Sequence, residues 1–290
     1  MSSINEISEL ANQWSDPSTA TKFAISERAT APFAKLMLQK THLTHPEGKV
    51  NILDFACGTG AVTAAAYAAI PKENWGNVKI LGTDVSQPML DFLKFRGEKA
   101  GWSGLETKIV DGRDITLPKE THTHLFINFA VFALPPSTVP ACAALLQPGG
   151  RIGVSSWKYA GWHTIVERAV ARLSNPPTVP SYDQLFDVIH DGRAWDTPEY
   201  VTQTLEDAGF IDVDVVIQKE RVDCGTPEQF ADTMFMLMGL IASFWEENKR
   251  ADLTQKVLRE LKKVVEEEIG RDGRFVLEFE GIVGVGRKPE

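Results

Sequence analysis

Residues 50–60 of this 290-residue chain join an apolar segment to a glycine-rich turn, a combination that can cradle a small ligand. The apolar segment predicts a buried strand with Asp54 at its carboxyl end, and Gly58 and Gly60 follow without side chains that would keep a ligand from the backbone. The alanine-rich segment 61–70 predicts a helix, whose first N–H groups point toward the turn. These residues predict a site that binds its ligand with backbone amides and a carboxylate.

Polar residues or glycines also end the next three predicted strands. The strands and their ends are 78–83 with Asp84, 107–110 with Asp111 and Gly112, and 124–129 with Asn128. Ligands of open parallel sheets bind outside the carboxyl ends of the strands, so we expect these residues at one edge. Asp84 follows Gly60 by 24 residues (84 − 60), about the spacing at which an acid accepts hydrogen bonds from a ribose diol.

The elements that position these residues alternate between strand and helix. Further helices are predicted at 87–99, 137–146 and 198–208, further strands at 151–157, 211–217 and 275–285, and two late helices from Thr226 and over 253–269. The alternation predicts an α/β fold with a doubly wound, mostly parallel sheet and helices on both faces. The last strand is expected to close the sheet as an antiparallel edge strand.

The chain is predicted to form one domain over residues 1–290. Residues 1–48 are expected to form an N-terminal helical cap. The segment 158–196 interrupts the alternation with tryptophans and prolines. We interpret 158–196 and 226–270 as helical insertions that form a lid over the substrate.

Composition excludes several function classes. The chain has 30 basic and 39 acidic side chains, a net charge of −9 and no basic cluster, which disfavours nucleic acid as a partner. Cys57, Cys142 and Cys224 lack the spacing of a disulfide framework or a zinc site. No signal peptide or membrane-spanning segment is visible, so a cytoplasmic protein without a membrane partner is expected.

A nicotinamide-dependent dehydrogenase is the first alternative for a glycine turn of this kind. Its fingerprint requires a third glycine, and this chain has Thr63 at that position. Asp54 would also repel a pyrophosphate, and it suits a ligand with a cationic amino group better. The turn therefore favours a ligand other than a dinucleotide.

Four segments, in order, resemble the successive motifs of class I S-adenosylmethionine-dependent methyltransferases. They are Asp54-Phe-Ala-Cys-Gly-Thr-Gly60, Gly82-Thr-Asp84-Val-Ser86 followed by Met89-Leu90, Asp111-Gly112, and Leu146-Gln-Pro-Gly-Gly150. The resemblance implies a Rossmann-like fold with a seven-stranded sheet, and S-adenosylmethionine as cofactor. It covers about residues 50–157.

The resemblance also implies roles for individual residues. Gly58 and Gly60 would line the amino acid moiety, Asp84 would bind the ribose hydroxyls, and Asp111 with Gly112 would contact the adenine edge. Met89 would pack on the adenine ring. The full cofactor site predicted in this way consists of Asp54, Ala56, Cys57, Gly58, Gly60, Asp84, Val85, Met89, Asp111, Gly112, Arg113, Asn128 and Phe129.

More loosely, the rest of the chain is similar to fungal natural-product methyltransferases of the gliotoxin thiol methyltransferase type. The segments concerned are Glu106-Thr-Lys-Ile-Val110, Ser156-Trp157 with Trp162, Gly192-Arg-Ala-Trp195, and Phe244-Trp-Glu-Glu247. This similarity implies a small secondary metabolite as methyl acceptor.

Aromatic residues outside the cofactor motifs are candidates for the acceptor pocket, although each could instead be ordinary core packing. They are Trp14, Phe23, Phe132, Trp157 and Trp162. His163 is the candidate general base. Many members of the family have an acid where this chain has Asn128, and no acid pair or histidine cluster is visible there, so no metal is expected.

The sequence predicts transfer of a methyl group from S-adenosylmethionine to a heteroatom of a small, fairly apolar molecule. Sulfur is favoured, as the similarity to thiol methyltransferases implies, and a thiol with a pKa of about 8.5 needs little help with deprotonation at neutral pH. A hydroxyl, phenol or carboxylate oxygen comes next. The alternative of another class is a regulatory protein that binds S-adenosylmethionine and methylates nothing. The acceptor, the number of methyl groups transferred and the oligomeric state stay open.

Overall fold

The computed structural model describes residues 17–43 and 48–290 and divides the chain into two compact units. The sheet unit consists of residues 30–158, 193–219 and 280–290. Of the described residues, the helical unit consists of 17–29, 159–192 and 220–279. Four elements, α2, β5, β6 and β7, contain a boundary between the units, and each unit is described by itself.

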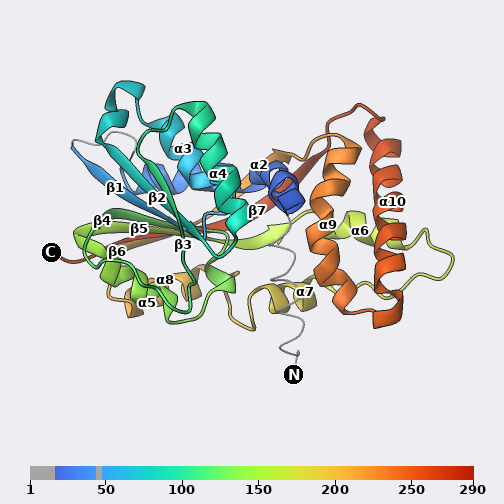
Figure 1. The fold of residues 1–290 in the computed structure, drawn as a ribbon. Helices are drawn as coiled ribbons and strands as arrows, with labels where there is room; N and C mark the ends of the chain where they lie inside the picture. The colour runs from blue at the N-terminus through green and yellow to red at the C-terminus, as the bar shows by residue number, and fades with distance from the viewer. Residues whose placement is uncertain (1–16, 44–47) are drawn as a thin grey trace. The chain divides into compact units, whose positions relative to one another are not determined.

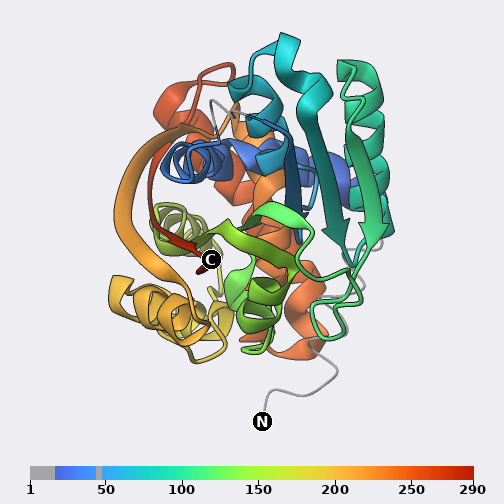
Figure 2. The same cartoon turned by 90° about the vertical axis from the view of Figure 1, so that its left-hand side faces the viewer.

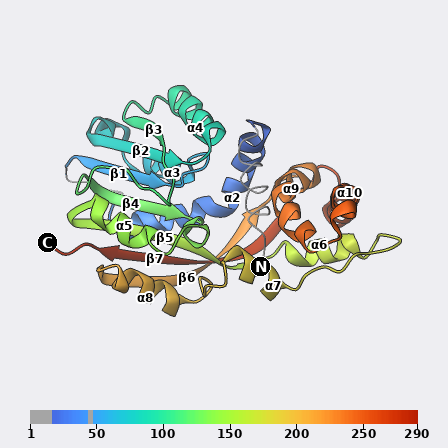
Figure 3. The same cartoon turned by 60° about the horizontal axis from the view of Figure 1, so that its bottom comes forward.

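A seven-stranded sheet is the centre of the fold. Its strands are β1 (Val50–Phe55), β2 (Val78–Asp84), β3 (Leu105–Ile109), β4 (His122–Asn128), β5 (Leu146–Ala160), β6 (Ile211–Asp223) and β7 (Val276–Arg287). The order across the sheet is β3-β2-β1-β4-β5-β7-β6, as the labels of Figure 3 show. All pairs from β3 to β5 are parallel, which confirms the predicted doubly wound α/β sheet.

The final strand runs antiparallel to its neighbour β5. Lys288 N donates to Gly150 O at 2.8 Å, and Gly161 N donates to Glu278 O at 3.0 Å, so partner numbers fall along β7 as they rise along β5. However, β7 lies between β5 and β6, and Figure 2 shows β6, in orange, at the side of the sheet away from β2 and β3. The prediction that the last strand forms the edge was therefore wrong. Strand order is decided by pairing between distant segments, which a local pattern does not encode.

Helices cover the sheet within its unit. They are α3 (Ala61–Ala69), α4 (Gln87–Ala100), α5 (Thr138–Leu145) and α8 (Pro198–Asp207), with the later part of α2 (Pro17–Lys40) and the short turns η1 (Lys72–Asn77) and η2 (Val131–Ala133). Figure 1 shows α3 and α4 above the strands and α5 with α8 below them. Ser86 caps α4 by accepting a hydrogen bond from Met89 N, because an N-cap hydroxyl satisfies an N–H of the first turn.

The hydrophobic core of the sheet unit joins α2, α3 and the central strands. Phe33 and Met37 of α2 are fully buried in it beside Ile52 of β1 and Phe126 of β4. The amphipathic spacing predicted for residues 33–38 is thus used for packing on the sheet. This packing fixes where the carboxyl ends of β1 and β4 lie.

The helical unit is formed around the late helices. Its elements are α6 (His163–Val170), α7 (Tyr182–Ile189), α9 (Pro227–Ser243), η3 (Glu247–Lys249) and α10 (Arg250–Ile269), with the first part of α2. α10 contacts both α9 and α6, and its buried stripe is Val257, Leu261, Val264 and Val265. The predicted capping box of Thr226 with Gln229 starts α9, and both of its hydrogen bonds are present.

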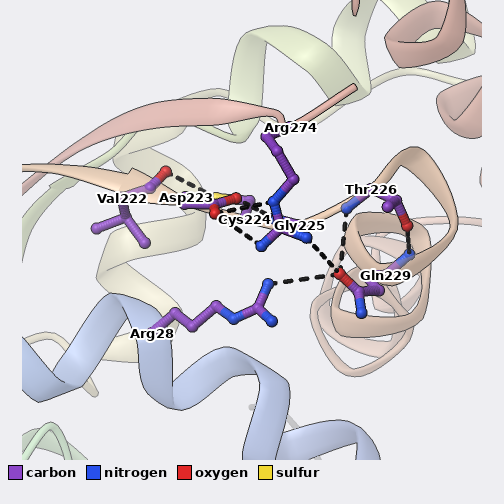
Figure 4. Close-up of polar contacts among 8 residues, drawn as sticks. All are labelled: Arg28, Val222, Asp223, Cys224, Gly225, Thr226, Gln229 and Arg274. Carbon is purple, nitrogen blue, oxygen red and sulfur yellow. Dashed lines mark hydrogen bonds and ion pairs between the residues drawn. The ribbon is translucent and has the colours of Figure 1, made fainter. Parts of the chain in front are cut away.

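A polar cluster joins four segments of the helical unit (Figure 4). Asp223, at the end of β6, accepts two hydrogen bonds from Arg274. Burial raises the pKa of the Asp223 carboxyl, but the hydrogen bonds from Arg274 and Gly225 N and the charges of Arg274 and Arg28 together hold that pKa below its usual value. Gln229 Oε1 accepts from Arg274 at 3.3 Å and from Arg28 of α2 at 3.4 Å. The side chain that caps α9 therefore also ties that helix to α2 and to the segment that precedes β7.

The described residues contain no helix that is both long and apolar enough to cross a bilayer. They also contain no group of three or more histidine, cysteine, aspartate or glutamate side chains arranged to hold a metal ion. The segments 158–196 and 226–270 are largely helical and fall mainly in the helical unit. That they act as a substrate lid, as part of one methyltransferase domain with a cap at residues 1–48, stays a prediction.

Candidate active site

The turn after β1 has the backbone that its glycines predicted. Gly58 has φ of 52° and Gly60 has φ of 92°, both in the left-handed region that favours glycine. Ala56 shares that region with φ of 54° although it carries a side chain. Gly60 is the N-cap residue of α3, and a Cβ atom there would stand 2.4 Å from Leu93 Cδ1. The strand, turn and helix of the predicted cradle are therefore confirmed.

Asp54 performs a structural task that the sequence did not reveal. Its side chain is buried, with 1% of its surface exposed, and Oδ2 accepts hydrogen bonds from Thr63 N at 3.0 Å and Thr63 Oγ1 at 2.7 Å. The carboxylate thereby satisfies donors in the first turn of α3. Its direct contact with the amino group of a ligand stays a prediction.

Asp84 lies at the carboxyl end of β2, next to the turn. Its Oδ2 accepts from Gly58 N at 2.8 Å, and its Oδ1 accepts from Ser86 N at 2.9 Å. Burial raises the pKa of the Asp84 carboxyl, and the backbone hydrogen bonds only partly offset this effect. Cys57 is buried and anchors the turn to β2, because its N donates to Thr83 O at 2.9 Å.

A ribose diol fits this arrangement, because its two hydroxyls can donate to a carboxylate that is poorly hydrated. Next to it, Val85 is 59% exposed and offers an apolar area that an aromatic ring could cover. Met89 was predicted to pack on that ring. Met89 is only 1% exposed, on the buried face of α4, and its contact with the ring stays a prediction.

The loop after β3 brings Asp111 near Asp84, since Val110 N donates to Asp84 O at 3.0 Å. Asp111 forms a bidentate pair with Arg113, which lowers the pKa of the Asp111 carboxyl. The pair is exposed, so it contributes little stability and opens easily for a ligand. Gly112 packs closely, because a Cβ atom there would stand 2.7 Å from Leu134 Cδ2.

The carboxyl end of β4 is fixed by a serine of β5. Asn128 and Ser155 are register partners in these parallel strands. Ser155 Oγ donates to Asn128 Oδ1 at 2.8 Å and accepts from Phe129 N at 2.9 Å. Phe129 has φ of 51°, an unusual value for a bulky residue, which this hydrogen bond helps to hold.

The left-handed backbone of Phe129 places its ring against Trp157. The two ring centroids are 3.7 Å apart with planes at 25°. Phe33 meets Phe129 edge-on at 5.0 Å and Trp157 at 6.0 Å. We call Phe33, Phe129 and Trp157 the aromatic cluster. It joins α2 to the carboxyl ends of β4 and β5.

The other predicted acceptor contacts are more dispersed. Phe132 is buried in η2, where its carbonyl accepts a hydrogen bond from Arg193 at 2.5 Å. Phe23, Trp162 and His163 belong to the helical unit, and their contact with an acceptor stays a prediction. Trp14 lies outside the described residues.

His163 is the first residue of α6 and is buried. Its Nε2 lies 2.9 Å from Pro180 O and, because a carbonyl only accepts, must carry the hydrogen. Its Nδ1, which can accept a proton, lies 3.7 Å from Glu167 Oε2. Nδ1 is therefore the atom through which His163 could act as a base.

Sequence reasoning missed Phe33, Thr63 and Ser155 as parts of the site. Thr63 had a local signal, since a hydroxyl in the first turn of a helix after Asp54 is a typical partner for a carboxylate. Phe33 and Ser155 had none, because their roles depend on contacts with residues 96 and 27 positions away (129 − 33 and 155 − 128).

The chain is similar to known methyltransferases. Residues 52–150 match the model of a methyltransferase domain family. The chain is 28% identical over 279 residues to methyltransferase tpcH of Aspergillus fumigatus, covering 94% of this chain and 98% of that protein. It is 25% identical over 282 residues to the acetylaranotin bis-thiomethyltransferase of Aspergillus terreus, covering 97% and 98%.

Solved structures show the same fold. The YcgJ protein of Bacillus subtilis aligns with a TM-score of 0.52 at 14% identity, covering 89% of this chain and 98% of that one. A methyltransferase-like protein of Bacillus halodurans aligns with a TM-score of 0.50 at 16% identity, covering 88% and 99%. The match over residues 52–150 and the similarity to the fungal proteins, together with the turn after β1 and the acid at the end of β2, support a class I S-adenosylmethionine-dependent methyltransferase similar to fungal natural-product methyltransferases.

Proposed function

We propose that this methyltransferase transfers the methyl group to the thiol sulfur of a small, fairly apolar secondary metabolite. The observation that carries the proposal is the aromatic cluster at the carboxyl ends of β4 and β5, beside the cradle formed by β1 and β2. The acetylaranotin bis-thiomethyltransferase, similar over nearly the whole chain, supports sulfur as the acceptor atom.

The residues of the sheet unit divide the work between cofactor and acceptor. Gly58, Gly60 and Asp84 hold S-adenosylmethionine, which supplies a methyl group on a sulfonium when bound. Val85 offers the adenine an apolar surface. Asp111 contacts the adenine edge through its carboxylate, once that carboxylate is released from Arg113. Phe129 and Trp157 exclude water from the acceptor, which favours an in-line displacement in which charge disappears.

A thiol places modest demands on the enzyme. Its ordinary pKa of about 8.5 leaves a few per cent ionised at neutral pH, so orientation and a dry pocket supply much of the rate. His163 is proposed to assist through Nδ1. Phe23, Phe132, Trp14 and Trp162 are proposed to complete the acceptor pocket.

The direct test is a screen with radiolabelled S-adenosylmethionine against a panel of thiols and phenols. Label transfer to thiols at higher kcat/KM than to matched phenols is expected. Transfer only to oxygen would reassign the acceptor atom. Binding of S-adenosylhomocysteine in a calorimeter without turnover of any panel member would instead indicate a regulatory protein.

The role of His163 has its own test. His163→Ala is expected to lower kcat for thiols by less than about tenfold and for phenols by more, because a phenol needs a base near neutral pH. The measurement is the pH profile of kcat for both acceptor classes. An unchanged profile for both would dismiss the base role. Thermal unfolding must accompany it, since His163 also holds Pro180 O.

A further inference from the structure

We propose that Ser155 orients the side chain of Asn128 so that its Nδ2–H donors face the acceptor, where they stabilise a deprotonated heteroatom. The inference rests on the proposed function. It adds that the site selects the deprotonated form of the acceptor. It makes Asn128 a group that touches the substrate and Ser155 a positioning residue.

The hydrogen-bonding capacity of the Ser155 hydroxyl decides the orientation of the Asn128 amide. A backbone N–H can only donate, so Phe129 N occupies a lone pair of Ser155 Oγ. The single hydrogen of that hydroxyl then goes to Asn128 Oδ1 at 2.8 Å. Ser155 is only 1% exposed, so losing either partner would leave a buried polar group unsatisfied. The amide oxygen of Asn128 is therefore held in place.

The other end of the amide can only donate. No described residue accepts a hydrogen bond from Asn128 Nδ2, and Asn128 itself is partly exposed. An amide N–H2 group stabilises an atom with a lone pair, above all an anion, and offers nothing to a protonated amine. The site thus favours thiolate or phenolate over ammonium.

Strand order places these donors on the acceptor side. The cofactor residues of the cradle are on β1 and β2, whereas Asn128 is on β4, on the far side of β1 from β2. Its neighbour in sequence, Phe129, stacks on Trp157 of β5 within the aromatic cluster. A dry wall next to an amide donor suits an apolar molecule that presents one ionisable atom.

The expected chemistry has a distinct pH signature. The thiol proton leaves to solvent, the acceptor sulfur forms a bond to the methyl carbon, and the bond from that carbon to the sulfonium breaks with its electron pair. Donors that stabilise the anion increase its fraction below the pKa of the acceptor. Above that pKa they no longer help, because the anion loses its charge during transfer.

Asn128→Asp is the sharpest variant, since its carboxylate can still accept from Ser155 while the donors are replaced by a negative charge. With benzylthiol as the acceptor, kcat/KM at pH 7 is expected to fall about 10- to 100-fold. The inflection of its pH profile is expected to move to higher pH, so that much of the rate returns in alkali. A profile that falls uniformly without moving would overturn the proposal.

The matched control is Asn77→Asp, which adds the same charge to an exposed residue of η1 at the amino end of β2. It should leave the benzylthiol profile within about twofold of wild type. The charged or titratable residues of the surrounding elements within the sheet unit are Asp54 of β1, His122 and His124 of β4, Arg151 and Lys158 of β5, and Lys35 and Lys40 of α2. They are common to all variants, so the shift between Asn128→Asp and Asn77→Asp isolates the amide.

Ser155 is tested by Ser155→Ala, which frees the amide to turn, and by Ser155→Thr, which keeps the hydroxyl. Ser155→Ala is expected to shift the pH profile of kcat/KM in the same direction as Asn128→Asp. Ser155→Thr is expected to keep the wild-type profile. Ser155→Ala that lowers kcat/KM equally at every pH would indicate a structural role only and would overturn the positioning claim.

Cofactor binding shows whether the Asn128 donors serve the acceptor or the carboxylate of the cofactor. S-adenosylhomocysteine and methylthioadenosine, which lacks the amino acid carboxylate, should both bind Asn128→Asp as they bind wild type. Selective loss of S-adenosylhomocysteine affinity would assign the donors to the cofactor carboxylate and overturn the inference. Wild-type protein that methylates no thiol or phenol would overturn the proposed function itself, whereas turnover with an unmoved profile overturns only this inference.

Discussion

The two sides of the candidate site in the sheet unit are organised in different ways. On the β1–β2 side, backbone amides and carboxylates within short segments hold one another, as Gly58 N does with Asp84. On the β4–β5 side, aromatic rings from Phe33, Phe129 and Trp157 meet across long sequence separations. The difference explains why the β1–β2 side, which we propose binds the cofactor, is readable as a local motif, whereas the β4–β5 side, which we propose binds the acceptor, is not.

Gly60→Ala should break the cofactor side most strongly. The new Cβ atom would stand 2.4 Å from Leu93 Cδ1 at a backbone with φ of 92°. A left-handed alanine costs about 1–2 kcal/mol and overpacking about 1–3 kcal/mol more. The free energy of unfolding in urea should therefore fall by the sum of both costs. Affinity for S-adenosylhomocysteine should fall more than about 100-fold, because the turn must move.

Gly101→Ala is the matched control for that variant. Gly101 has φ of 74°, but an added Cβ atom would meet no other atom within 4 Å, so only the conformational penalty remains. Equal losses of stability in the two variants would show that the contact with Leu93 relaxes freely.

Asp84→Asn should weaken S-adenosylhomocysteine binding by about 10- to 100-fold, since two hydrogen bonds to a charged acceptor become weaker. In the wild type, burial raises the Asp84 pKa above 3.8, and the ligand prefers the ionised carboxylate. Affinity should therefore fall as pH is lowered through this raised pKa, and calorimetry at several pH values measures it. A pH dependence that survives in Asp84→Asn would assign it to another group.

The raised pKa of Asp84 affects the stability of the free protein in the opposite direction, so that stability falls as pH rises. A carboxyl whose pKa is raised by folding contributes stability below its unfolded pKa and loses it as pH rises through the folded pKa. Ligand binding thus offsets a penalty that the ionised Asp84 imposes at neutral pH.

Trp157→Ala should affect the acceptor side alone. The KM for a thiol acceptor should rise about tenfold, because the ring that stacks on Phe129 is lost, while S-adenosylhomocysteine affinity stays within about threefold. Trp75→Ala, a partly buried tryptophan that meets Tyr67 edge-on, controls for a general loss of about 2 kcal/mol of stability. Equal effects on KM in both variants would contradict an acceptor role.

Arg113→Ala should have the smallest effect. It releases the exposed Asp111 carboxylate, whose pKa should rise toward its ordinary value because Arg113 now lowers it. Affinity for S-adenosylhomocysteine should change less than about threefold, and in the direction of tighter binding if the ligand displaces the arginine. A large loss would mean that Arg113 itself contacts the ligand.

Local segments predicted much of this protein. The turn from Asp54 to Gly60, the acid at residue 84 and the capping box at Thr226 depend on residues within a few positions, or on a strand-to-strand spacing that parallel sheets repeat. The conformation of these segments follows from backbone geometry that only certain residue types allow. The resemblance to class I methyltransferases likewise rested on short segments, the turn from Asp54 to Gly60, Gly82–Leu90, Asp111-Gly112 and Leu146–Gly150.

Tertiary structure alone decided the rest. The place of β7 inside the sheet, the burial of Met89, and the contact of Phe33 with Trp157 each depend on which distant surfaces pack together. The orientation of the Asn128 amide is settled by a hydroxyl on the neighbouring strand. Such contacts are chosen by total burial and hydrogen-bond satisfaction across the whole sheet, and no local pattern contains that information.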